Sequence, residues 1–342
     1  MSDYNIAGIQ QVGVGVENLE VAWKWYAKHF GMDLPIFNDA AEATLMSEFT
    51  GNKAQKRKAV LAMNLQGGGG FEVWQFTSRT PTAAKNKIKE GDLGINSVQM
   101  RCLDVHKAKQ YFDKLPNISC SEIKRNDLNK SYFEVIDPFS NSFKIIEDNY
   151  QFMRTQSLVG GVMGATIGVS DIDKSLKLYT EALNYKVVQP KQLGDDGLER
   201  IWLKPAYKKT SAFSQLLGPT QLELVCDPKN KRNQIFENRF WGDLGFIHIC
   251  FDVQNMNSLR EKVKRIGHGF VVDSENSFDM GEAAGQFAYV QDEDKTLIEL
   301  VETHKVPILK KLSWYIHLKG KKNQKPLPRI IFKVLGMKRL KT

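Results

Sequence analysis

The feature that most constrains this chain is a pattern that occurs four times. Each copy is a stretch dense in β-forming residues, then an Asn or Asp, then a stretch with helical spacing of its apolar residues. The first kind of stretch predicts a strand, and Asn and Asp are favoured residues at a helix N-cap. The four expected caps are Asn18, Asp104, Asp171 and Asn255. The chain is therefore predicted to contain four similar strand–helix modules.

Each predicted module carries one marked residue in its first strand, seven residues before the cap, and a second in a closing strand. From the first module to the fourth, the pairs are Gln11 with Glu72, Ser97 with Lys144, Gly164 with Glu223, and His248 with Glu299. Corresponding residues of modules one and three, and of modules two and four, are 151 to 155 residues apart. This constant period indicates that a two-module unit has been duplicated.

The duplication predicts three regions of the chain. Modules one and two occupy residues 1–155, modules three and four occupy residues 156–303, and residues 304–342 form a C-terminal extension. The net charge of the whole chain is +9, but residues 304–342 hold twelve Lys or Arg and no Asp or Glu, which leaves −3 for residues 1–303. The body of the protein therefore offers no electrostatic case for binding nucleic acid.

The extension mixes apolar and basic residues at roughly helical spacing in 306–318 and again in 329–341. This pattern predicts a basic helical extension and is typical of a helix that lies at a membrane interface. Two roles stay open for residues 304–342. They could contact an anionic membrane surface, which would suggest a lipophilic substrate, or they could pack against the body of the protein.

The cysteines and the N-terminus bear on the cellular compartment. The four cysteines are scattered and form no CxxC motif, which fits a reducing cytoplasm. The first five residues show neither the basic nor the apolar region of a signal peptide. We expect a cytoplasmic protein, peripheral at the membrane if the extension binds there.

The order of these elements resembles that of the vicinal-oxygen-chelate superfamily, which contains glyoxalase I and the extradiol dioxygenases. The resemblance covers residues 6–303 and rests on the fourfold recurrence, because each motif is short. It implies an α+β fold of four βαβββ modules, paired into two open cup-shaped barrels. It also implies that the marked residues of two paired modules bind one divalent metal ion inside a cup.

How the modules pair decides which marked residues meet. Pairing in sequence order would place the Lys144 ammonium beside Gln11 and Glu72, where it would repel a divalent ion. The other cup would then hold a three-ligand site made of His248, Glu299 and Glu223. Crossed pairing, which the resemblance to single-chain four-module glyoxalases implies, would unite Gln11, Glu72, His248 and Glu299. We favour the crossed pairing, since it leaves one intact site and lets Lys144 pair with Glu223 in the other cup.

The ligand set implied by crossed pairing is one amide, one imidazole and two carboxylates, which suits Zn²⁺, Ni²⁺, Co²⁺, Mn²⁺ or Fe²⁺. Four protein ligands leave two octahedral positions for a small-molecule substrate with vicinal oxygens. Such an ion acts as a Lewis acid and stabilises an enediolate, and Glu72 or Glu299 could accept the proton that is released. The resemblance therefore implies a metal-dependent lyase or isomerase of glyoxalase or epimerase type.

Two other functions stay open. An extradiol-type or keto-acid-type Fe(II) dioxygenase would use two His and one Glu, but Gly164 stands where such enzymes place the second His. The other alternative is a non-catalytic protein that binds a small molecule, and the retained ligand set argues against it.

Overall fold

The computed structural model describes residues 3–206, 211–275, 278–279, 284–309, 314–318 and 324–341. Module one consists of β1 (Asn5–Gly15), α1 (Leu19–Phe30), β2 (Leu34–Glu42), β3 (Lys56–Met63) and β4 (Gly70–Phe76), with a 3₁₀ turn at Thr44–Thr50. Module two consists of β5 (Gly94–Cys102), α2 (Val105–Phe112), β6 (Ser119–Cys120), β7 (Lys124–Arg125), β8 (Ser131–Ile136) and β9 (Ser142–Glu147).

The third and fourth modules repeat this order. Module three consists of β10 (Val159–Gly168), α3 (Ile172–Lys177), a π-helical turn (Leu178–Ala182), β11 (Tyr185–Leu193), β12 (Glu199–Pro205), α4 (Ser214–Leu217) and β13 (Gln221–Cys226). Module four consists of β14 (Gly245–Gln254), α5 (Met256–Arg265), β15 (Phe270–Asp273), β16 (Phe278–Asp279), β17 (Ala284–Gln291) and β18 (Leu297–Leu309).

The four helices begin where the sequence predicts. In each module the side chain of the expected cap accepts a hydrogen bond from the backbone N–H three residues further on, which satisfies a donor that the helix leaves unpaired. The caps are Asn18, Asp104, Asp171 and Asn255. The local sequence therefore sets the strand–helix boundary of every module.

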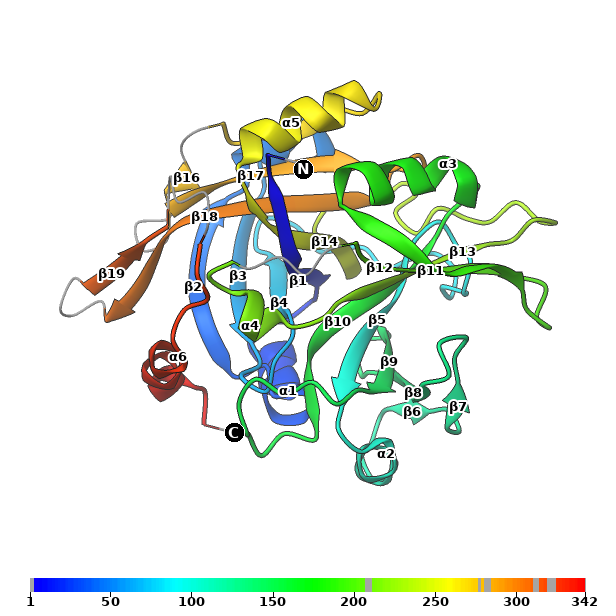
Figure 1. Cartoon of the computed structure of the whole chain (residues 1–342), viewed down its shortest axis with the longest axis horizontal. Coiled ribbons are helices and arrows are strands. Elements are labelled where there is room, and N and C mark those ends of the chain that lie inside the picture. Colours follow the sequence, from blue (N-terminus) through cyan, green and yellow to red (C-terminus); the bar gives the residue numbers. More distant parts are fainter. Residues whose placement is uncertain are drawn as a thin grey trace.

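The strand pairing shows how the modules combine. Strand β1 pairs antiparallel with β14, and β5 pairs antiparallel with β10. One sheet therefore has the order β15-β17-β18-β14-β1-β4-β3-β2, and the other has the order β11-β12-β13-β10-β5-β9-β8-β6. The first of these sheets joins modules one and four, and we call it the first cup. The other sheet joins modules two and three, and we call it the second cup. The module helices lie outside the strands (Figure 1). The expected fold of paired modules is confirmed, and the pairing is crossed.

The two cups meet at a close crossing of their backbones. A Cβ atom on Gly68 would lie 2.4 Å from the carbonyl carbon of Gly161, and Gly68 has a φ of 124°. Gly68 belongs to a run of four glycines that ends at the first residue of β4, and Gly161 lies in β10. Only glycine allows both the close approach and this backbone conformation, so the crossing accounts for glycine at both positions.

The first half of the C-terminal extension differs from the expectation. Strand β18 continues to Leu309 and pairs with β19 (Trp314–His317). The expectation of a helix over 306–318 is therefore wrong for the residues in these two strands. Residues 310–313 lie outside the described residues. Val306 pairs with Ile316, and backbone pairing along the sheet edge prevails over the helical spacing of the side chains. The second half does form a helix, α6 (Arg329–Leu335), followed by a 3₁₀ turn (Gly336–Lys338).

Helix α6 packs onto the first cup, and Figure 1 shows it on the same side of the molecule as the β18–β19 hairpin. Its residues Ile331, Phe332 and Leu335 are buried in one apolar cluster with side chains of β2 and β3. Arg339 forms an ion pair of 2.5 Å with Asp33, just before β2. The extension is thus a packed part of the protein. Among the residues that the structure describes, no helix combines the length and apolarity needed to cross a bilayer.

Candidate metal centre

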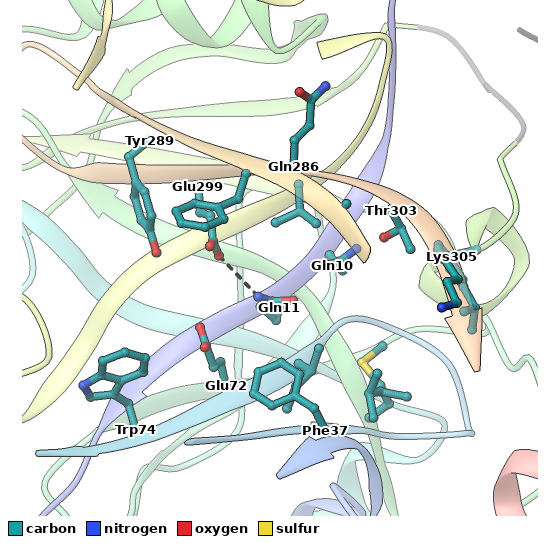
Figure 2. A pocket seen from close by; sticks show the side chains of 18 of the residues that line it. Gln10, Gln11, Phe37, Glu72, Trp74, Gln286, Tyr289, Glu299, Thr303 and Lys305 are labelled. Carbon is teal, nitrogen blue, oxygen red and sulfur yellow. Dashed lines mark hydrogen bonds between the residues drawn. The ribbon is translucent and has the colours of Figure 1, made fainter. Parts of the chain in front are cut away.

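Four neighbouring strands of the first cup bring the predicted ligands together. Gln11 lies on β1, Glu72 on β4, His248 on β14 and Glu299 on β18, and these strands are adjacent in the order β18-β14-β1-β4. In the close view, Glu72 points across the cup toward Gln11 and Glu299 (Figure 2). All four residues are buried. The crossed pairing is what assembles this set, because His248 and Glu299 come from the module at the other end of the chain.

The potential ligand atoms of this cluster lie close to one another. The Nε2 atom of His248 is 3.1 Å from Oε2 of Glu299 and 3.4 Å from Oε2 of Glu72. Nε2 of Gln11 donates a hydrogen bond of 3.3 Å to the same oxygen of Glu299. Within the described part of the chain, Glu72, His248 and Glu299 form the group whose ligand atoms all lie within 4.8 Å of one another.

Two buried atoms of this cluster have no hydrogen-bond partner. They are Nε2 of His248 and Oε1 of Gln11. The imidazole nitrogen is at ion-pair distance from both carboxylates, yet its geometry is not that of a hydrogen bond. A buried polar atom without a partner is costly, so these atoms call for a ligand that is not a protein group. A divalent cation fits, since two carboxylates would neutralise its charge.

The charges of the cluster shift the pKa values of its members. Burial opposes a charge on His248, but the carboxylates of Glu299 and Glu72 outweigh burial and raise the imidazole pKa to about 9. Burial also works to raise the pKa of Glu299, but the neighbouring His248 outweighs it, so this pKa lies below its ordinary value. The cluster therefore attracts positive charge strongly, and a metal ion would take the place of a proton on His248.

Three residues around His248 lie outside the pattern of marked positions. A Cβ atom on Gly13 would lie 2.5 Å from Cε1 of His248, so only glycine leaves room for the imidazole. The hydroxyl of Tyr289 is 3.5 Å from Nδ1 of His248, and the ring of Trp241 lies parallel to the imidazole within 11°. Tyr289 lies opposite Glu299 in the register of β17 and β18. The fourfold repeat could not reveal these three residues, because they do not recur at the corresponding positions of the other modules.

The second cup holds an ion-pair cluster at the corresponding place. Nζ of Lys144 lies 2.9 Å from Oε2 of Glu223 and 2.8 Å from Oε1 of Glu90. Burial disfavours the Lys144 ammonium, but these two carboxylates outweigh it and hold the lysine pKa above its ordinary value. The alternative ligand set of His248, Glu299 and Glu223 is therefore not brought together, because Glu223 lies in the other cup. The ammonium of Lys144 lies between Glu223 and Glu90 in this cup.

A cavity of about 440 Å³ opens from the candidate metal centre. Gln11, Glu72 and Glu299 line one part of it, beside Trp74 and Tyr289. The rest of its wall is mostly apolar. Cavities of this size and character are typical of sites for small molecules.

The chain is similar to proteins of known fold. Residues 162–300 match the model of the Glyoxalase/Bleomycin resistance protein/Dioxygenase superfamily. The structure of glyoxalase I from Zea mays aligns with a TM-score of 0.57 and 14% identity, over 87% of this chain and 93% of that chain. A putative dioxygenase from Bacillus subtilis subsp. subtilis str. 168 aligns with a TM-score of 0.61 and 12% identity, over 98% of this chain and 97% of that chain. These identities show a shared fold alone. No curated protein sequence matches the chain.

Proposed function

We propose that this chain, which belongs to the glyoxalase/bleomycin resistance protein/dioxygenase superfamily by the match of residues 162–300 to its model, is a metal-dependent enzyme of glyoxalase or epimerase type. The observation that supports this reaction is the buried cluster of Gln11, Glu72, His248 and Glu299 at the end of an apolar cavity. A divalent ion bound there, whether zinc, nickel, cobalt, manganese or iron, would supply a Lewis acid that stabilises an enediolate of a substrate with vicinal oxygens.

The two carboxylates would take different roles. Glu299 accepts a hydrogen bond from Gln11 and lies 3.1 Å from His248, so it is held in place as an ionised ligand. Glu72 faces it from the other side of the cup and lines the cavity (Figure 2). We assign to Glu72 the removal of the proton from the substrate carbon next to the carbonyl. The aromatic wall formed by Trp74 and Tyr289 would exclude water from that proton.

A dioxygenase is the second candidate, because the Bacillus subtilis neighbour carries that description and aligns over nearly the whole chain. Because the pairing is crossed, Gly164 is not the residue that argues against a dioxygenase. Gly164 lies in the second cup, and in the first cup the marked first-strand residue that accompanies His248 is Gln11. The candidate centre therefore contains one His and two Glu, which favours enediolate chemistry over the dioxygen chemistry of a two-His site.

The substitution Glu72→Gln tests the reaction. The wild-type protein, loaded with each metal in turn, is expected to exchange the carbon-bound proton of an α-hydroxy ketone for deuterium, as followed by NMR in D₂O. Glu72→Gln should lower this exchange by about 10²- to 10⁴-fold, the usual contribution of a positioned base, and should retain metal. Oxygen consumption with a catechol by the iron-loaded protein would instead support the dioxygenase, and bound metal without exchange or oxygen uptake would support a binding protein.

A further inference from the structure

The wall of the first-cup cavity limits what can occupy it. Away from the metal centre it is formed by apolar side chains of β2, β3, α4 and the extension, among them Leu34, Phe37, Leu61, Met63, Leu217 and Val306. Polar ligand atoms gather at one end, around Gln11, Glu72 and Glu299 (Figure 2). An occupant that fills this space would place its oxygens at that end and mostly apolar groups along the rest of its length.

The C-terminal extension completes this apolar wall. Phe332 and Leu335 of α6 line the cavity from one side, and Phe332 also packs edge-on against Phe152, with ring centroids 5.0 Å apart. The ion pair between Arg339 and Asp33 and a hydrogen bond of 2.8 Å from the Leu340 N–H to the Asp33 carbonyl hold α6 against the start of β2. The extension thus enlarges the apolar part of the cavity at a distance from the metal ligands.

Charged groups in this part of the wall are few. The guanidinium of Arg57 forms an ion pair with Asp39 and lies over the ring of Trp74. The ammonium of Lys305 lies 4.1 Å from the centre of the Tyr315 ring. Glu42, at the end of β2, is exposed. A substrate with several charges along its length would therefore meet few opposite charges in this wall.

We propose that the substrate is an amphiphile, in which two vicinal oxygens are joined to an unbranched or ring-containing apolar group that lies between β2, β3 and α6. This rests on the proposed function, since the metal centre would hold the oxygens. The apolar group supplies binding free energy through burial, and each buried methylene raises affinity by up to about fourfold.

Alkyl hydroxamates test this substrate class, because their two adjacent oxygens chelate a divalent ion without reacting. Calorimetry on the metal-loaded protein should show affinity rising by about two- to fourfold per methylene from acetohydroxamate to octanohydroxamate. Phe37→Asn, which places an amide in the apolar wall, should flatten this dependence. An affinity independent of chain length, or a dependence that Phe37→Asn leaves unaltered, would overturn the proposal.

A second series separates this proposal from the metal centre. Alcohols from 1-butanol to 1-octanol carry one oxygen and should bind metal-free protein with the same dependence on chain length, again flattened by Phe37→Asn. If the alcohols show this dependence but acetohydroxamate binding does not require metal, the metal centre fails and the apolar cavity stands. If acetohydroxamate requires metal but neither series depends on chain length, the cavity proposal alone fails.

A different observation concerns the outer face of α6. Ile330 and Met337 are 63% and 74% exposed, more than any other large apolar side chain among the described residues. Ile330 lies in α6 and Met337 in the 3₁₀ turn that continues it, and exposed Lys325, Arg329 and Lys333 lie close to them in sequence. Residues 304–342 contain no acidic residue, so no negative charge of this segment opposes an anionic surface.

From these exposed residues we infer that the outer face of α6 docks on an anionic membrane. The basic side chains would approach lipid headgroups while Ile330 and Met337 enter the interface. Because the inner face of the same helix lines the cavity, docking would bring the apolar cavity next to the lipid from which an amphiphile could come.

Vesicle sedimentation tests this docking. The full-length protein should bind vesicles of phosphatidylcholine and phosphatidylglycerol, should not bind phosphatidylcholine alone, and should be released at high salt because screening shortens the attraction. The double variant Ile330→Ser/Met337→Ser should lose most of the binding. Leu193→Ser, at a residue that is 60% exposed on β11, serves as the matched control and should bind normally. Equal binding by the double variant, or a protein dimer that this variant dissolves, would overturn the proposal.

Discussion

His248→Ala is expected to purify with little metal, whereas Glu223→Ala should keep the metal content of the wild type. The two residues occupy first-strand and closing-strand positions of the repeat, but they lie in different cups. Removing His248 takes away the atom that lies within 3.4 Å of both carboxylates and leaves those carboxylates to repel each other. The loss of metal affinity should exceed the roughly 10- to 100-fold that follows loss of a group outside the ligand shell.

Glu223→Ala should instead lower the stability of the protein. Glu223 is one of two carboxylates that hold the buried Lys144 ammonium, and breaking a buried ion pair costs about 3–5 kcal/mol. Glu90 remains as a partner, so we expect the lower end of that range. Elemental analysis of protein purified without added metal, together with thermal unfolding, measures both effects. Metal loss in Glu223→Ala, with normal metal in His248→Ala, would refute the assignment of the centre to the first cup.

Phe332→Ala should lower the free energy of unfolding by about 3 kcal/mol, the usual cost of truncating a buried phenylalanine. Phe332 is 2% exposed and packs against Phe152 and other apolar residues of the cluster between α6 and the first cup. The truncation leaves a void next to the cavity. Because the cavity wall can relax into this void, we expect the loss of unfolding free energy to stay at the lower end of the usual range. Urea unfolding measures the change.

Ile330→Ala is the matched control for Phe332→Ala, because Ile330 belongs to the same helix and faces outward. Its free energy of unfolding should stay within about 0.5 kcal/mol of the wild type, as is usual for an exposed side chain. Equal effects of the two substitutions would show that α6 does not pack on the cup through Phe332.

The sequence alone determined the local structure of the modules and the positions that could carry ligands. Each helix begins at its expected Asn or Asp because capping is a short-range interaction between a side chain and a backbone N–H three residues away. The marked residues, such as His248 and Glu299, could be found because duplication repeats a position in the chain whether or not its chemistry is kept. Periodicity and capping are properties of neighbouring residues, and a single sequence displays them.

The tertiary structure settled which ligands meet, between two pairings that the sequence left open, and it alone decided what surrounds them. Strand β1 pairs with β14, more than two hundred residues away. The first strands of all four modules are alike in pattern, so the sequence favoured this partner only through the charge of Lys144 and the family resemblance. The structure alone places Gly13 and Tyr289 beside His248. In the extension, residues 306–309 have helical spacing but continue β18, because the sheet offers their backbone hydrogen bonds and the apolar cluster buries Val306. Such long-range contacts depend on which strand edges and apolar surfaces remain exposed once each module has formed, and only the folded chain shows which of these pair with one another.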